Sequence, residues 1–262
     1  MSQTKIHYAA EGGIAWIHLV DPPANTYSYA MMRELDEAIL TARMDASVHA
    51  IVLRGEGDKF FCAGADIKML TEADFTFKYY FCLHANETLN RLEQTPKVVI
   101  AALNGHCVGG GLEVALAADL RVAKKGGGKI GLPEVGLGVL PGTGGTQRLA
   151  RNLGRAKAFE LMATGRTFSF EEAHALGLVH EVFEAETFDA QVREYAAQFL
   201  PPSRASMAVG HIKRAVVSGM EAGFSEGLAL ERELQQRLFE SDDAREGLAA
   251  YLERRPPKFT GR

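Results

Sequence analysis

The sequence predicts an α/β fold, because short apolar strands alternate with helical patterns over the first 200 residues. Residues 14–20 and 50–54 have the composition of strands, and residues 30–44 between them repeat apolar side chains at helical spacing. A predicted helix over 79–94 leads to a third strand, the β-branched run 98–103. Such alternation favours right-handed crossover connections.

The remaining elements follow in order. The helix over 30–44 is bounded by Ser28 and Asp45, and a Gly/Asp-rich turn precedes the segment 60–68. A short strand over 120–123 leads into the basic, glycine-rich Lys124–Lys129, which we interpret as a solvated hairpin tip. A Gly- and Pro-rich stretch follows, and a helix begins near Gly144.

The pattern changes after residue 200. Residues 205–218, 223–240 and 242–254 are helical patterns with no strand between them, and Ser203 and Ser225 are candidate caps for the first two. We therefore expect an α/β body over 1–200 and a helical region over 201–262. These helices have little core of their own, so we expect them to pack on the body or on another subunit.

Composition excludes several functions. The 262 residues are 47% apolar and 24% charged, and the net charge of −4 gives no broad basic field for nucleic acid or an acidic membrane. Three cysteines without CxxC spacing favour reduced thiols and a cytoplasmic protein. We find neither a signal-peptide pattern nor an apolar run of about 18 residues, and expect no membrane span.

The chain is organised around residues 98–120. Three glycines, Gly109, Gly110 and Gly111, separate the apolar strand from an alanine-rich helical segment whose first turn contains Glu113. Amides at a glycine-rich helix start carry partial positive charge and are open to a ligand oxygen. This stretch fits a site that polarises a carbonyl group, and equally a tight turn in which glycine serves packing alone.

A second amide is expected in the small-residue segment 62–66. An N–H there and that of Gly110 would form an oxyanion hole, in which losing one donor costs on the order of 3 kcal/mol. Taken alone, this segment is more simply a bulged strand end where alanine and glycine fit.

Two carboxylates are candidates for proton transfer. The helix dipole favours the ionised form of Glu113, which suits a general base, although an ordinary helix-start acid is the simpler interpretation of this residue taken alone. Apolar neighbours would raise the pKa of Glu134 and make it a proton donor, unless it faces water or pairs with Arg148.

Other chemistries lack their motifs. The eight histidines show no HxxxH spacing, so we expect no metal. No Gly-Xaa-Ser-Xaa-Gly elbow is present, and the glycine triplet lacks the following Lys-Ser or Lys-Thr of a phosphate-binding loop. Two acids and two amide sites instead suggest acid–base chemistry on a polarised carbonyl compound.

These residues resemble motifs of the crotonase superfamily and, within it, of the enoyl-CoA hydratases. The similarity extends over nearly the whole chain, through residues 61–68, 104–113, 132–134 and 141–149 and the tail at Phe259.

The resemblance implies a crotonase-like spiral of ββα units with a C-terminal helical trimerisation region, in a homotrimer or a hexamer built as a dimer of trimers. It implies an acyl-CoA substrate, with coenzyme A as part of the substrate and no separate cofactor. The amides of Ala65 and Gly110 would hold the thioester oxygen. Coenzyme A would lie along Ala63, Ala65, Asp66, Ile67 and Lys68, with Gly110 also in contact.

Both family glutamates are present, so the implied reaction is syn hydration of a 2-enoyl-CoA to a 3-hydroxyacyl-CoA, as in fatty acid β-oxidation. Glu113 would deprotonate the water that attacks C3, and Glu134 would protonate C2. The alternatives are another crotonase reaction, such as double-bond isomerisation, or an RNA-binding or scaffold protein on a crotonase body.

Three features depart from the family pattern or leave it open. Residues 25–29, Asn-Thr-Tyr-Ser-Tyr, replace an Asn-Ala-Leu-like segment, and Thr260 stands where many hydratases have a lysine. Five aromatic residues between 75 and 81 lie at the variable acyl-pocket helix. They could favour a bulky acyl group, but core packing is the simpler explanation.

Overall fold

The computed structural model describes residues 4–262, which contain two sheets. The first has six strands, in the order β1 (Ile6–Glu11), β2 (Ile14–Leu19), β3 (Ala50–Gly55), β5 (Val98–Leu103), β7 (Leu120–Lys124) and β10 (Glu181–Phe183). The second has four, in the order β4 (Phe60–Cys62), β6 (His106–Val108), β8 (Lys129–Gly131) and β9 (Phe168–Ser169). The pairs β1/β2 and β8/β9 are antiparallel, and the other neighbours are parallel.

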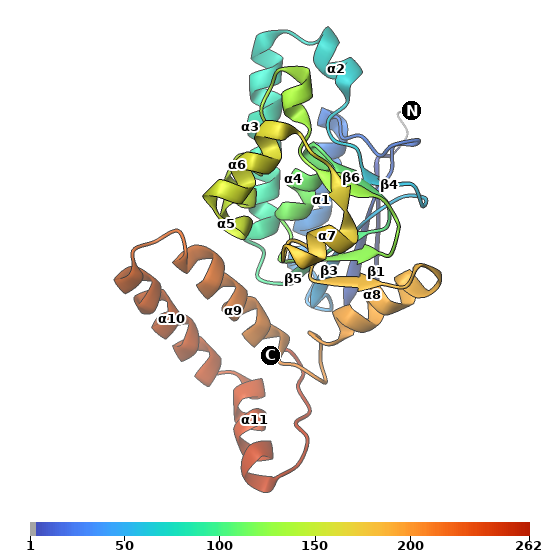
Figure 1. The fold of residues 1–262 in the computed structure, drawn as a ribbon. Helices are drawn as coiled ribbons and strands as arrows, with labels where there is room; N and C mark the ends of the chain where they lie inside the picture. The colour runs from blue at the N-terminus through green and yellow to red at the C-terminus, as the bar shows by residue number, and fades with distance from the viewer. Residues whose placement is uncertain (1–3) are drawn as a thin grey trace.

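The chain winds through both sheets as a spiral. In each of the pairs β3/β4, β5/β6 and β7/β8, the first strand joins the large sheet and the second joins the small one. Helices follow each pair, which confirms the predicted spiral of ββα units (Figure 1). The interpretation of Lys124–Lys129 as a hairpin tip is wrong, because β7 and β8 belong to different sheets and this segment carries the chain between them.

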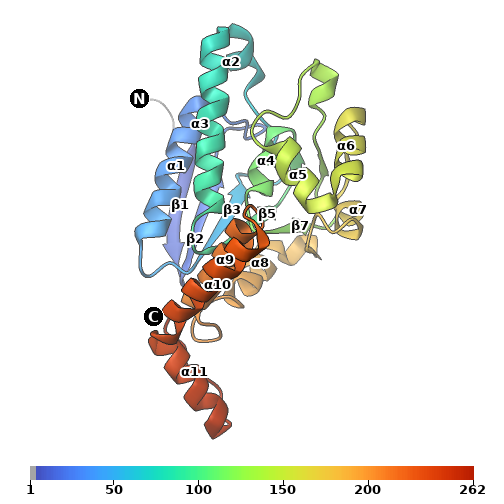
Figure 2. The same ribbon diagram turned by 90° about the vertical axis from the view of Figure 1, so that its left-hand side faces the viewer.

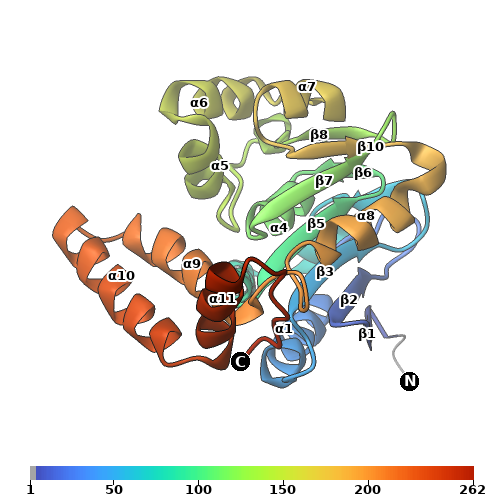
Figure 3. The same cartoon turned by 90° about the horizontal axis from the view of Figure 1, so that it is seen from below.

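Alternate side chains of the large sheet enter two separate cores. Ala15 and Ile17 of β2 pack in the main core with the small sheet and the helices above it, whereas Ile14 and Trp16 pack under α8 on the opposite face (Figure 3). The helices of the body are α1 (Tyr29–Met44), α2 (Ile67–Glu72), α3 (Phe75–Glu93), α4 (Gly110–Leu116), α5 (Gly145–Leu153), α6 (Arg155–Thr164), α7 (Phe170–Ala175) and α8 (Phe188–Ala197). Two 3₁₀ turns, η1 (Glu134–Leu137) and η2 (Ala185–Thr187), complete it.

The aromatic run at the start of α3 is not core, contrary to the simpler prediction. Phe81 alone of the five is buried, whereas Phe75 is 89% exposed and Tyr79 and Tyr80 are also largely exposed. Residues 75–81 form the beginning of α3, at the end of this helix that follows α2 (Figures 1 and 2). Single-sequence periodicity cannot distinguish an apolar helix face that meets the core from one that faces a ligand or another chain.

The C-terminal region consists of α9 (Ser206–Gly219), α10 (Phe224–Phe239) and α11 (Asp242–Glu253), of which α9 packs against the body and α11 lies farthest from it (Figures 1 and 2). The prediction that Ser203 and Ser225 cap α9 and α10 is wrong, because Ala205 and Gly223 hold those positions without a side-chain hydrogen bond. Ser241 caps α11 instead. Within residues 4–262, no helix is both long enough and apolar enough to cross a membrane.

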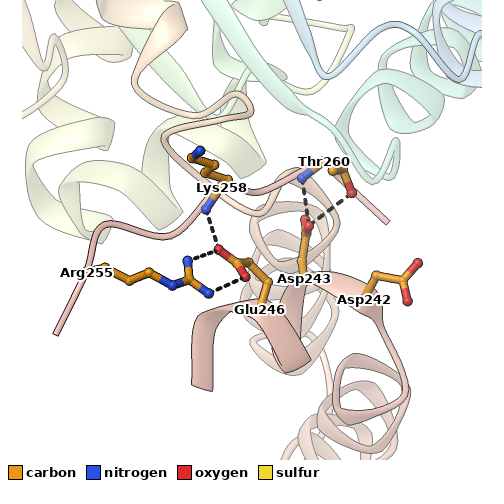
Figure 4. A pocket seen from close by; sticks show the side chains of 6 residues that line it. All are labelled: Asp242, Asp243, Glu246, Arg255, Lys258 and Thr260. Atoms are coloured by element: carbon orange, nitrogen blue, oxygen red, sulfur yellow. Dashed lines mark hydrogen bonds and ion pairs between the residues drawn. The ribbon is translucent and has the colours of Figure 1, made fainter. Parts of the chain in front are cut away.

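The end of the chain folds back on α11. The buried carboxylate of Asp243 accepts hydrogen bonds from the N–H groups of Thr260 and Gly261, and Glu246 accepts two from Arg255 and one from the Lys258 N–H (Figure 4). A small hollow lies among these side chains. Because its acids already have partners within the chain, we assign it a structural role.

Helix α9 is attached to the body by an ion pair. Lys213 Nζ lies 2.9 Å from Asp119 Oδ2, and both side chains are largely buried. Asp119 also accepts the N–H of Val99 at the start of β5. Close packing adds to this contact, since a Cβ on Gly210 would lie 2.1 Å from the Pro96 carbonyl oxygen.

We predict that Lys213→Ala lowers the free energy of unfolding by about 3 kcal/mol, because it leaves the Asp119 charge buried and unpaired. Lys125→Ala is the control: Lys125 forms an exposed ion pair with Glu184 and should have little effect. Urea denaturation monitored by circular dichroism measures both. Equal effects of the two variants would contradict the prediction.

Candidate active site

The site is built around the turn between β6 and α4. Gly109 adopts φ +57° and donates its N–H to the Gly131 carbonyl. Gly110 is the first residue of α4, so its N–H has no acceptor within the helix. A Cβ on Gly109 would lie 3.1 Å from Glu134 Oε1, which places that carboxyl directly against the turn.

Ala65 lies beside this turn. The Gly64 carbonyl accepts a hydrogen bond from the Tyr27 N–H, and the Asp66 N–H donates one to the Tyr27 carbonyl. Because Ala65 lies between these two residues, its own N–H is directed away from Tyr27. Gly64 adopts φ +96°, and a Cβ there would lie 3.0 Å from the Gly110 nitrogen. The structure thus brings together the two segments whose amides we expected to act on one oxygen.

Glu113 is deeply buried, with 2% of its surface exposed. Oε1 accepts the N–H groups of Thr143 and Gly145, each at 2.7 Å, and Oε2 accepts the Thr143 hydroxyl. Burial raises the pKa of Glu113, while these hydrogen bonds and the Arg148 charge oppose that rise. The helix dipole alone is therefore an incomplete account of Glu113: three donors hold its ionised form in a buried place.

Glu134 has the opposite environment. It opens η1, and its buried Oε2 has no hydrogen-bond partner. Burial, reinforced by the charge of Glu113, raises its pKa to about 7. The alternative pairing with Arg148 does not occur, because Arg148 binds Glu93 and Asn90.

The two acids lie close enough for the charge of Glu113 to act on Glu134, and each lies against a glycine. A Cβ on Gly145 would lie 3.0 Å from Glu113 Oε1, as one on Gly109 would from Glu134 Oε1 at 3.1 Å. One carboxyl is stabilised as an anion and the other readily stays protonated near neutral pH. Next to two amides, such a pair can remove one proton and deliver another at a polarised carbonyl compound.

The other predicted residues lie along the segment from β4 to α2. Ala63 and Asp66 are half-buried, and Ile67 and Lys68 are exposed. The Asp66 carboxylate caps α2 by accepting the N–H groups of Lys68 and Met69. In the described part of the chain, no group of three or more His, Cys, Asp and Glu side chains could hold a metal ion.

Two residues of this site were missed. The Tyr27 hydroxyl lies 3.1 Å from Thr143 Oγ1, and Thr143 binds Glu113. Sequence signals were present in both cases: Tyr27 lies in the segment that departs from the family pattern, and Thr143 lies in the motif at 141–149. Neither signal indicates that the two side chains meet, since 116 positions separate them.

We predict that Glu134→Gln stabilises the fold, and more so at pH 8 than at pH 4.5. The unfolded carboxyl ionises near its ordinary pKa of 4.5 and the folded one near 7, so wild-type stability declines as the pH rises between these values. The wild-type free energy of unfolding falls by on the order of 2 kcal/mol over this range, a value reduced to account for solvent around the half-buried carboxyl. Thermal unfolding at the two pH values measures it, and an equal gain at both would refute it.

Comparisons with known proteins agree with this architecture. Residues 9–262 match the family model described as enoyl-CoA hydratase/isomerase. The chain is 38% identical to a probable enoyl-CoA hydratase of Bacillus subtilis, with 98% of each chain covered, and 36% identical to the short-chain-enoyl-CoA hydratase of Clostridium acetobutylicum, covering 94% and 93%. A crystal structure of the Geobacillus kaustophilus enoyl-CoA hydratase superposes with a TM-score of 0.96 at 45% identity, covering 100% and 98%. The chain therefore belongs to the enoyl-CoA hydratase/isomerase family of the crotonase superfamily.

Proposed function

We propose that the chain is an enoyl-CoA hydratase in which Glu113 and Glu134 add water across the 2,3 double bond of a 2-enoyl-CoA thioester. The family and the names of full-length relatives support the activity. The observation that carries the assignment of roles is the contrast between the two carboxyls, one held by three donors and one with a buried oxygen that has no partner.

In this mechanism the amides of Ala65 and Gly110 bind the thioester oxygen. Negative charge grows on that oxygen as water attacks C3, so these amides stabilise the transition state more than the substrate. Glu113 takes a proton from the water, and Glu134 donates its proton to C2. Double-bond isomerisation is the rival reaction, and it would leave one of the two acids without a role.

We assign coenzyme A to the segment Ala63–Lys68, as part of the substrate and without a separate cofactor. The exposed Lys68 is available to a phosphate, whereas Asp66 is engaged as a helix cap. The exposed aromatic residues of α3 are candidates for contacts with the acyl group. A place in β-oxidation and a cytoplasmic location complete the proposal.

We propose further that 201–262 mediates assembly into a trimer or a hexamer of two trimers. Helices α9–α11 leave large apolar side chains exposed, and the 12 positions of α11 bury only Asp243 and Ala250. The exposed set comprises Ile212, Val216, Met220, Phe224, Leu228, Phe239, Leu248, Tyr251 and Leu252. Such a surface is typical of an interface.

We predict that Glu113→Gln and Glu134→Gln each reduce kcat on crotonyl-CoA by at least about a hundredfold, while KM changes little. Wild-type kcat/KM should fall as the pH rises through about 7, because Glu134 must be protonated. Loss of the conjugated thioester absorbance measures the rate. Full activity in either variant would remove that residue from the mechanism.

We predict a particle of three or six chains in solution, which light scattering on a size-exclusion column measures directly. Tyr251→Glu and Leu252→Glu together should shift the mass toward the single chain, because they place charge in the proposed interface. Glu181→Lys, on β10, is the control. A monomeric wild-type protein would contradict the proposal.

A further inference from the structure

A buried polar chain joins Tyr27 to Glu113. The Tyr27 side chain is 3% exposed, and its hydroxyl lies 3.1 Å from Thr143 Oγ1, which is itself bonded to Glu113 Oε2. Tyr27 precedes α1, Thr143 precedes α5, and Glu113 lies in α4, so the chain connects three separate parts of the fold.

The direction of the two hydrogen bonds follows from the protons available. An ionised carboxylate only accepts, so Thr143 must donate its single hydroxyl proton to Glu113. Thr143 can then only accept from Tyr27. Tyr27 is able to donate, because burial, together with the charge of Glu113, raises the pKa of its phenol well above its usual value.

Tyr27 also touches both amide segments. Its backbone is bonded to Gly64 and Asp66 on either side of Ala65, and a Cβ on Gly110 would lie 2.2 Å from its hydroxyl oxygen. Its ring packs against Phe81 of α3, with ring centroids 5.9 Å apart. The hydroxyl is therefore held in place at the point where it meets Thr143.

We propose that Tyr27 and Thr143 are positioning residues for Glu113. The hydrogen bond from Tyr27 fixes the direction of the Thr143 O–H bond. The Thr143 hydroxyl in turn keeps the Glu113 carboxylate ionised and oriented. This inference rests on the proposed function, since it describes how the general base is prepared. It gives a role to Tyr27 in the segment 25–29, which departs from the Asn-Ala-Leu-like pattern of the family.

The charged and titratable groups around Glu113 determine which limb of a pH–rate profile reports its ionisation. Arg148 of α5 acts on Glu113 electrostatically, Glu113 acts on Glu134 of η1, and Cys82 of α3 and Tyr27 lie nearby. Burial raises the pKa of Cys82 and of Tyr27, so both stay neutral in acid. Glu134 titrates near 7 and governs the basic limb, which leaves the acidic limb to Glu113.

The test compares Tyr27→Phe, Thr143→Ala, Thr143→Ser and the double variant Tyr27→Phe/Thr143→Ala on crotonyl-CoA. Tyr27→Phe should lower kcat about three- to tenfold and Thr143→Ala about ten- to a hundredfold, with KM nearly unchanged. Both should move the acidic limb of the kcat/KM profile to higher pH. Thr143→Ser should restore most of the loss, and the double variant should be no slower than Thr143→Ala.

Tyr195→Phe is the matched control, because Tyr195 packs between Phe183 and Phe199 on the far face of the large sheet. It should leave the rate and the profile unchanged. A Tyr27→Phe enzyme with wild-type kcat and acidic limb, or a double variant whose losses multiply, would overturn the inference.

A substrate-free measurement separates this inference from the proposed function. Infrared titration of the Glu113 carboxyl, with Glu113→Gln as the reference, should show its pKa raised by Tyr27→Phe and raised further by Thr143→Ala. A wild-type protein without hydratase activity would refute the proposed function alone. An unchanged pKa of Glu113 in both variants would refute the inference that Tyr27 and Thr143 position Glu113.

Discussion

The site depends on close contact between two main-chain segments, and this contact is possible because glycines occupy the points where the segments meet. A Cβ on Gly111 would lie 2.0 Å from the Cys62 carbonyl oxygen, and one on Gly64 would lie 3.0 Å from the Gly110 nitrogen. Only glycine permits β4 and the start of α4 to pack so closely. This contact sets the separation of the Ala65 and Gly110 amides, and it leaves no room for adjustment by side chains.

The two carboxyls show how one small region sustains opposite protonation preferences. Glu113 is buried and Glu134 is half-buried, and burial raises the pKa of each. The difference comes from partners: Glu113 receives three donors, whereas Glu134 Oε2 has none. An unsatisfied buried oxygen costs stability, and the lack of a donor leaves the raised pKa of Glu134 without compensation at that oxygen.

The sequence was most informative where local chemistry decides the outcome. The strand at 98–103, the glycine turn and the helical C-terminal region follow from composition and periodicity alone, and Glu113 and Glu134 stand out beside glycine and proline. Contacts between segments distant in the chain could not be predicted from the sequence. Nothing local indicates that Tyr27 reaches Thr143, that Ala205 rather than Ser203 occupies the N-cap of α9, or that Phe75 faces outward while Phe81 packs inward. These outcomes depend on tertiary packing, which a single sequence does not display.

Helix α3 connects the exposed aromatic cluster with the part of the site that holds Glu113. Arg148 binds Glu93 and Asn90 of α3, and Asn86 donates to the Gly142 carbonyl next to Thr143. The exposed aromatic residues stand at the other end of the same helix. The loop that donates hydrogen bonds to Glu113 is therefore anchored on the same helix whose other end carries the exposed aromatic side chains.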